Sequence, residues 1–324
     1  MSKFKRKKER EAEGAFDIED IIREAKKHKI TGILIPRKNA DLVEVPDWIP
    51  MPKPILKILG TPGIPCGLIT MVYGKRDSGK TTFSIEALAS AQRENGIAVL
   101  IDTEHKFNFK RAELVGLDRN SLALVRAASI EQVFDKFVGI VNIIKNNPKM
   151  KNRKMVCVWD SLGATPTDAE CDGKSKDFAM TAARVIKGGL RKVVRFIHDT
   201  KVAFVIINHS YTKMVSWGDP DQPYGGSGPE YHSALTLKFT KIGRVRPPKA
   251  AKESPFCGIR TKIECVKNHL GQPFAFGEVQ IDGKGFVVDR DPTYVREYVE
   301  DAASDELPTE EGKGDGNGEE SGDP

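Results

Sequence analysis

The sequence has 324 residues, 39% of them hydrophobic and 30% charged, which is the composition of a globular protein with a large core. No run of about 18 apolar residues could span a membrane. The N-terminal stretch MSKFKRKKEREAEG lacks the apolar segment of a signal peptide, so we expect a cytoplasmic protein without a membrane partner. Five cysteines without a C-x-x-C pair predict neither a zinc site nor a disulfide framework.

The formal net charge of +6 hides a strong asymmetry along the chain. Residues 300–324 carry ten carboxylates and one lysine, a net charge of −9, so residues 1–299 together carry +15. A body this basic favours a polyanionic partner such as a nucleic acid, although an ordinary solvated surface can carry the same charge. Charge alone leaves both interpretations open.

The sequence pattern divides the chain into four parts. Residues 1–15 are charged and poor in apolar side chains, which predicts a basic disordered arm. Residues 16–50 contain FDIEDIIREAKKH, with apolar positions at helical spacing, then the strand-like TGILIP and a linker. This helix–strand unit is too small to be stable alone, so we expect it to dock on its own core or on a neighbouring subunit. Residues 51–290 predict the core, and residues 291–324 predict a short helix and an acidic disordered tail.

The core alternates between apolar strands and amphipathic helices. The runs LITMVYG, IAVLID, KMVCVWDS and VAFVIINHS predict strands, and stretches such as SIEQVFDKFVGIVNIIKNN predict helices between them. This alternation is typical of an α/β fold with a mainly parallel sheet and helices on both faces. The later runs SALTLKFTKIG, GIRTKIECVKN and AFGEVQI predict antiparallel strands that extend the sheet at its C-terminal side.

A phosphate-binding loop follows the first core strand. Gly74, Gly79, Lys80 and Thr81 match G-x-x-x-x-G-K-[ST] between a predicted strand and a predicted helix, the context that this motif requires. Glycines let backbone N–H groups face an anion, Lys80 neutralises phosphate charge, and the Thr81 hydroxyl is a ligand for Mg²⁺. We therefore expect ATP and Mg²⁺ as cofactors, with the whole loop and the next turn in contact with the nucleotide: Gly74, Lys75, Arg76, Asp77, Ser78, Gly79, Lys80, Thr81 and Thr82.

Two carboxylates complete the expected catalytic site. Asp160 ends the strand MVCVWD, so it lies at the edge of the sheet where ligands of open α/β folds gather, and it suits a second Mg²⁺ anchor. Glu104 follows the strand AVLID at the same edge and is the best candidate to polarise the attacking water. The alternative for Glu104 is an exposed loop glutamate without a catalytic role.

The segments VYGKRDSGKTT, AVLIDTEH, VCVWDSLG and VIINHS, in this order, resemble the RecA recombinase family. The likeness covers residues 16–290, and INHSY followed by GGSGPEY is closest to the phage UvsX-type branch, which would place a phage-encoded protein in the host cytoplasm. The resemblance implies a RecA-like ATPase core and a helical homo-oligomeric filament joined through the N-terminal helix and strand. It also implies that the catalytic residues are Lys80, Glu104 and His209.

The same resemblance implies roles for further residues. Arg111 matches the position that stacks on adenine, and Asn108 lies near the base edge. Segments 168–178 and 210–226 match the first and second DNA-facing loops. The expected DNA-binding residues are Lys174, Lys176 and Arg184 at the first loop, and Tyr211, Lys213, Trp217, Tyr224, Gly225 and Gly226 at the second.

Two positions depart from bacterial RecA. His209 stands where that protein has glutamine; both side chains can hydrogen-bond a γ-phosphate, and the alternative is a satisfied core histidine. In CVKNHLG, bacterial RecA has two lysines that reach a neighbour's nucleotide, whereas this chain has Lys267 and His269, so Lys267 is the one dependable cation of the pair. The C-terminal DNA-gathering domain of bacterial RecA has no counterpart in the pattern, which would leave duplex capture to the core surface or the basic arm.

The expected function is an ATP-dependent recombinase that forms filaments on single-stranded DNA and promotes pairing and strand exchange with homologous duplex DNA. The second loop begins directly after His209, so the γ-phosphate could bias a DNA-contacting loop. Single-strand-binding and mediator proteins are expected partners. Two alternatives remain: a RecA-core hexameric helicase, and a recombinase paralogue or mediator that does not exchange strands.

Overall fold

The computed structural model describes residues 18–29, 47–173, 178–212, 220–247, 255–287 and 298–299. The chain divides into two units, Met1–Trp48 and Ile49–Pro324. In the first unit, the amphipathic stretch forms helix α2 (Ile18–Lys27), with Lys26 and Lys27 in its last turn, where cations complement the helix dipole. The predicted arm and the TGILIP segment lie outside the described residues.

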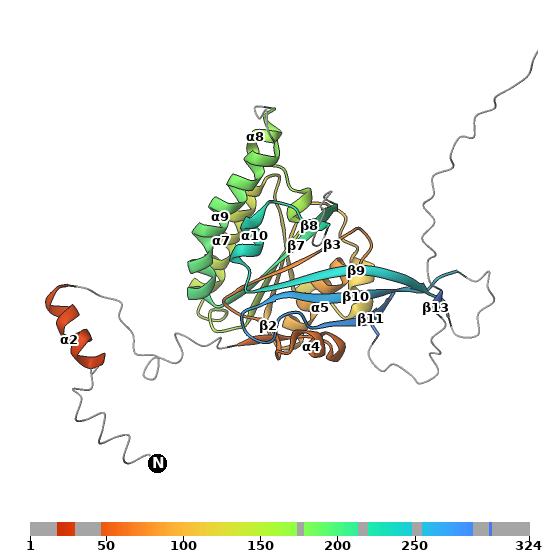
Figure 1. Ribbon diagram of the computed structural model, residues 1–324, viewed down its shortest axis with the longest axis horizontal. Helices are drawn as coiled ribbons and strands as arrows, with labels where there is room; N and C mark the ends of the chain where they lie inside the picture. Colours follow the sequence, from red (N-terminus) through yellow and green to blue (C-terminus); the bar gives the residue numbers. More distant parts are fainter. Residues whose placement is uncertain are drawn as a thin grey trace, which may run out of the picture. The chain divides into compact units, whose positions relative to one another are not determined.

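The second unit is built on one large sheet, drawn in Figure 1, with the strand order β12-β11-β10-β9-β3-β7-β6-β4-β5. Its central strands are rich in branched apolar residues and buried along their length. The strands of this path are β3 (Ile69–Gly74), β4 (Ile97–Asp102), β5 (Leu122–Arg126), β6 (Met155–Asp160), β7 (Val202–Thr212), β9 (Leu235–Val245), β10 (Gly258–Asn268), β11 (Phe276–Asp282) and β12 (Gly285–Phe286).

The sheet is parallel from β5 to β9 and antiparallel from β10 onward, which confirms the predicted fold class. One detail differs, because β9 was expected to be antiparallel and is parallel to β3. The chain returns from the end of β7 through α10 (Ser227–His232) before it enters β9. Such a crossover brings the next strand back in the same direction.

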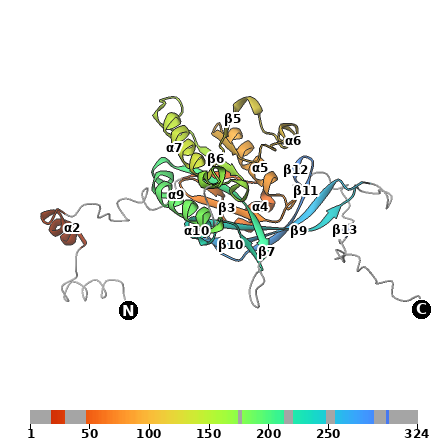
Figure 2. The same cartoon turned by 90° about the horizontal axis from the view of Figure 1, so that it is seen from above.

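Helices cover both faces of the sheet (Figure 2). On one face, α4 (Lys53–Leu59), α5 (Lys80–Arg93) and α6 (Phe109–Val115) contribute to one hydrophobic core. On the other face, α7 (Ile130–Asn146) and α9 (Phe178–Thr200) contribute to the second. Alternate residues of β3, β4, β6 and β7 enter opposite cores, as the pleat requires. Both cores hold the carboxyl ends of the parallel strands at one rigid edge.

Short elements complete the unit. Strands β1 (Trp48–Pro50) and β2 (Gly63–Pro65) form a separate two-stranded sheet, and β8 (Asp221–Pro223) pairs with the end of β7. The remaining elements are the 3₁₀ turns η1 (Arg119–Ser121) and η2 (Leu162–Ala164) and the helix α8 (Asp168–Cys171). Among the described residues, no helix combines the length and the apolar character needed to cross a membrane.

Of residues 291–324, for which the pattern predicts a short helix and an acidic tail, the structure describes Tyr298 and Val299 alone. Tyr298 and Val299 form β13, which pairs with Val245 and Arg244 of β9. The ladder between β9 and β3 ends at Phe239, so that edge of β9 is open farther along the strand. Tyrosine and valine favour strands, and pairing there satisfies backbone groups that β3 leaves unpaired.

Candidate active site

The glycine loop between β3 and α5 closes around the Lys80 ammonium group. Lys80 Nζ donates hydrogen bonds to the carbonyl oxygens of Gly74 at 2.8 Å and Lys75 at 2.7 Å. Gly79 has φ +98°, a backbone conformation that residues with a side chain rarely adopt. A Cβ atom on Gly74 would lie 2.1 Å from the carbonyl oxygen of Phe239, so both positions require glycine. This geometry leaves a cradle at the N-terminus of α5, where backbone N–H groups and the helix dipole attract an anion.

Lys80 is buried and has several negative neighbours. Burial lowers the pKa of its ammonium group, while Asp160, Glu104 and Asp77 act in the opposite direction. The ammonium group donates its hydrogen bonds to neutral carbonyl oxygens, and a phosphate oxygen is a stronger, charged acceptor for the same group. The loop therefore fits the phosphates of a nucleotide.

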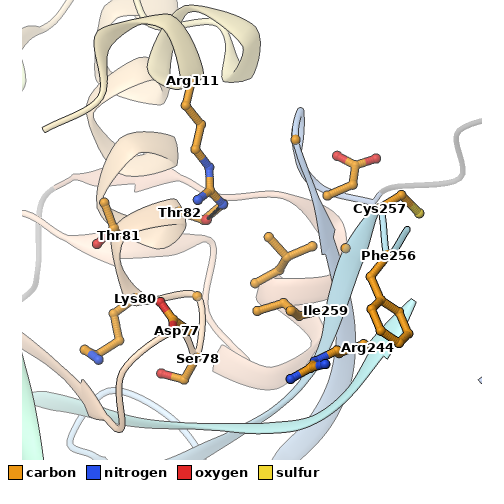
Figure 3. Close-up of a pocket in the computed structure, with 15 residues that line it drawn as sticks. Asp77, Ser78, Lys80, Thr81, Thr82, Arg111, Arg244, Phe256, Cys257 and Ile259 are labelled. Atoms are coloured by element: carbon orange, nitrogen blue, oxygen red, sulfur yellow. Dashed lines mark hydrogen bonds between the residues drawn. The ribbon is translucent and has the colours of Figure 1, made fainter. Parts of the chain in front are cut away.

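A pocket of about 590 Å³ opens beside this loop (Figure 3). One wall is the loop and the first turn of α5, above which Arg111 of α6 points toward Thr82 and donates to its hydroxyl at 2.8 Å. Arg111 Nε is buried and has no hydrogen-bond partner among the described residues. The opposite wall comes from the far strands and comprises Arg244, Phe256, Cys257, Gly258, Ile259, Ile281, Asp282 and Gly283.

Three carboxylates lie close together at the carboxyl ends of β4 and β6. Asp102 and Asp160 face each other in the register of these strands, and Asp102 accepts the backbone N–H of Glu104 at 3.1 Å. The pKa of Asp160 is raised to about 7, mainly because the carboxyl group is buried and also because Glu104 and Asp102 bring negative charge near it. This cluster carries more negative charge than Lys80 can neutralise.

The donors at this point suit Mg²⁺. The Thr81 hydroxyl is close enough to the Asp160 carboxylate to lower its pKa, so two hard oxygen ligands lie near each other. Within the part of the chain that the structure describes, no cluster of three or more histidine, cysteine or acidic side chains could hold a metal by itself. Mg²⁺ commonly takes one or two protein ligands together with phosphate and water, and these residues fit that mode.

Glu104 and His209 meet through the hydroxyl group of Ser161. Ser161 Oγ donates to Glu104 Oε1, and His209 Nε2 lies 2.9 Å from the same oxygen and 2.9 Å from Ser161 Oγ. Burial would raise the pKa of Glu104, but the hydrogen bonds from Ser161 and His209, together with the nearby positive charge, including that of Lys106, outweigh it, and the pKa lies below its usual value. Glu104 is thus kept ionised, as a group that accepts a proton from water must be.

The candidate DNA-facing residues are only partly described. Arg184 is exposed on α9, and Tyr211 is exposed near the end of β7. Tyr224 is half-buried and packs against the second core. Gly225 and Gly226 lead into α10 with φ +92° and +70°. Lys174, Lys176, Lys213 and Trp217 lie outside the described residues.

Two expected nucleotide contacts have other partners within the chain. Asn108 lies at the start of α6, where its side-chain oxygen accepts the Arg111 backbone N–H at 3.1 Å. Lys267 Nζ donates to the carbonyl oxygens of Glu230 at 2.8 Å and Tyr231 at 3.1 Å. Both groups would have to exchange these bonds to reach a nucleotide.

Sequence reasoning missed two parts of the site. Ser161 follows Asp160 directly at the strand end, a position from which it could have been inferred. The opposite wall of the pocket, with Arg244 and Phe256, lies more than 160 residues after the glycine loop and carries no motif. Only the pairing of β9, β10 and β11 brings it to the nucleotide cradle.

Comparisons with known proteins agree on one family. Residues 49–286 match the family model described as RecA N-terminal domain. "Protein RecA" of Chlorobaculum parvum is 32% identical over 225 residues, which cover 69% of this chain and 61% of that protein. "Protein RecA" of Aquifex aeolicus is 31% identical over 253 residues, covering 77% of this chain and 69% of that protein. The chain thus spans less than two thirds of the length of the Chlorobaculum relative.

Proposed function

The chain belongs to the RecA family, and from that premise we propose that it is a DNA-dependent ATPase that polymerises on single-stranded DNA and promotes homologous pairing and strand exchange. The observation that carries the proposal is the convergence of Lys80, Asp160, Glu104 and His209 at the carboxyl ends of adjacent parallel strands. In that register Gly74 of the phosphate cradle lies beside His209, the residue that precedes the second loop.

In the proposed hydrolysis, a water oxygen forms a bond to the γ-phosphorus, and the bond from that phosphorus to the bridging oxygen of ADP breaks. The electron pair of the broken bond stays on ADP, and Glu104 accepts the proton of the water. Lys80 balances the charge on the phosphates. Mg²⁺ held by Thr81 and Asp160 would neutralise part of the same charge.

Strand β7 links the nucleotide site to DNA in this proposal. It runs from the buried core through His209 to Tyr211 and Thr212, and Ser210–Thr212 pair with β8. Lys75 of the glycine loop also lies 3.4 Å from Asp221 of β8. A change in the γ-phosphate can therefore reach the second loop through two contacts, and DNA bound there can act back on hydrolysis.

We further propose that residues 16–50 join neighbouring subunits head to tail. Such a heterologous contact does not close on itself and builds a helical filament. We also propose that, within the RecA family, this chain is most closely related to the UvsX-type branch. Electron micrographs with single-stranded DNA and a non-hydrolysable ATP analogue distinguish filaments from the rings of a hexameric helicase.

The decisive assay measures ATP turnover with and without single-stranded DNA, followed by strand exchange with a homologous duplex. Lys80→Ala should abolish ATP-dependent activity without loss of the fold, because it removes a phosphate contact and two hydrogen bonds within the loop but no apolar side chain of either core. Glu104→Gln should bind nucleotide and DNA but hydrolyse slowly, since an amide can orient water but cannot take its proton. Lys149→Ala, at an exposed lysine after α7, is the matched control. ATP turnover that single-stranded DNA does not stimulate, or that Lys80→Ala does not abolish, contradicts the proposal.

A further inference from the structure

We infer that Ser161 is a positioning residue for Glu104. The Glu104 carboxylate has two hydrogen-bond partners: Ser161, which is fixed, and His209, which belongs to the strand that leads toward DNA. This inference rests on the proposed function. Both partners donate to one oxygen, Glu104 Oε1. The two donors differ in how firmly the fold holds them, and this difference assigns their roles.

Ser161 is anchored on every side. Its side chain is fully buried, and its backbone N–H donates to Thr103 Oγ1 at 3.1 Å. Its carbonyl oxygen accepts from Thr103 Oγ1 at 3.1 Å and from Thr165 Oγ1 at 2.6 Å, and the two threonine hydroxyl oxygens lie 2.9 Å apart. These three residues connect the ends of β4 and β6, which are paired strands in the interior of the sheet.

His209 is more exposed than Ser161 and lies on the strand that pairs with β8. It lies at the point where β7 changes from buried to exposed residues, and its backbone oxygen accepts the N–H of Tyr224 from the segment after β8. Gly163 leaves room for the imidazole ring, since a Cβ atom there would lie 2.9 Å from His209 Cδ2. A shift of the β7–β8 pair therefore moves His209 Nε2, while Ser161 Oγ stays in place.

The division of roles has a chemical consequence. When His209 turns toward a phosphate or follows DNA, Glu104 loses one hydrogen bond and keeps the other, so its carboxylate stays aimed at the water. Without the hydroxyl of Ser161, the described contact that remains once His209 leaves is the exposed Lys106, whose Nζ lies 3.7 Å from Glu104 Oε2 and not from Oε1. Hydrogen bonds to charged groups are strong enough for this loss to cost about ten- to hundredfold in rate.

The test compares Ser161→Ala with Ser90→Ala. Ser90 is a buried serine of α5 away from Glu104, and its hydroxyl donates to the Pro50 carbonyl oxygen at 2.6 Å. Ser90→Ala therefore also removes a buried, hydrogen-bonded hydroxyl. Ser161→Ala should lower the kcat of DNA-stimulated ATP hydrolysis about ten- to hundredfold and leave KM and nucleotide affinity within about twofold. Ser90→Ala should leave kcat unchanged. If Ser161→Ala does not fold, Ser161→Cys preserves the volume with a weak donor and should give the same kcat loss.

A double-mutant cycle separates positioning from general damage. If Ser161 acts through Glu104, Ser161→Ala should cause no further loss in a Glu104→Gln background. A loss that multiplies in that background, or a wild-type or increased kcat in Ser161→Ala, overturns the inference and leaves the proposed ATPase intact. Wild-type protein that shows no DNA-stimulated turnover overturns the proposed function and this role with it.

Discussion

Two adjacent glycines in α9 allow the packing of the second core to be tested by comparing one position that faces this core with one that does not. Gly188 and Gly189 share the same helix, but a Cβ atom on Gly188 would meet nothing within 4 Å, whereas one on Gly189 would lie 2.1 Å from Cε2 and 2.3 Å from Cδ2 of Phe134. Phe134 is buried and packs edge-on against Trp159, with 5.6 Å between the ring centroids. A shift of the ring away from Gly189 would therefore disturb its packing against Trp159.

The magnitudes follow from two effects. Alanine is favoured over glycine inside a helix by about 1 kcal/mol, and this gain applies to both positions. Forcing an extra methyl group into a packed core costs about 1–3 kcal/mol, and this cost applies to Gly189 alone. Gly188→Ala should therefore stabilise the protein by up to about 1 kcal/mol. Gly189→Ala should lie about 1–3 kcal/mol below it in free energy of unfolding, because the helix term cancels between the two variants.

Urea unfolding followed by far-ultraviolet circular dichroism measures both variants against the wild type. The m-value should stay constant, so that the midpoints report stability directly. The two midpoints should move in different directions, or Gly189→Ala should at least fall clearly below Gly188→Ala. Equal midpoints for the two variants would refute the close packing of α9 against α7.

Three further predictions concern the site and the tail. Thr81→Ala should raise the Mg²⁺ concentration needed for half-maximal turnover, because it removes one of two oxygen ligands, and coincident Mg²⁺ curves would contradict that role. Phe256→Ala should weaken nucleotide binding about fivefold in titrations, equivalent to about 1 kcal/mol of lost apolar contact, with kcat unchanged. Phe274→Ala, at an exposed phenylalanine, is its control. Deletion of residues 301–324 should strengthen DNA binding, most at low salt and more for duplex than for single strands, because nine net negative charges no longer compete with phosphates. A merely solubilising tail predicts unchanged affinity at every salt concentration and poorer solubility.

The features predicted well from the sequence are those with local signals. The alternation of apolar strands with amphipathic helices is periodic, so the parallel sheet and its two helical faces could be predicted from it. The glycine loop carries its own motif, and Asp160 and Glu104 follow apolar strands at positions that a parallel sheet brings to one edge. Each of these inferences needed only a few consecutive residues.

The features that were missed depend on long-range pairing. The orientation of β9 is decided by α10, a six-residue helix whose sequence SGPEYH has no apolar stripe. Strand β5 is a half-exposed edge strand with the short sequence LALVR, which single-sequence patterns hardly separate from a loop. The far wall of the pocket combines residues from three strands, and no short pattern encodes such a meeting. The role of Ser161 depends on hydrogen-bond distances that only the folded chain defines.

The lengths of α9 and β7 are closely matched. Helix α9 has 23 residues and rises about 34 Å along its axis at about 1.5 Å per residue. Strand β7 has 11 residues and extends about 36 Å at about 3.3 Å per residue. The chain thus travels along the helix and back along the strand over nearly equal lengths. Removing one helical turn from α9 would shorten the helix by about 5 Å relative to the strand, close to the rise of one and a half nucleotides of stacked DNA.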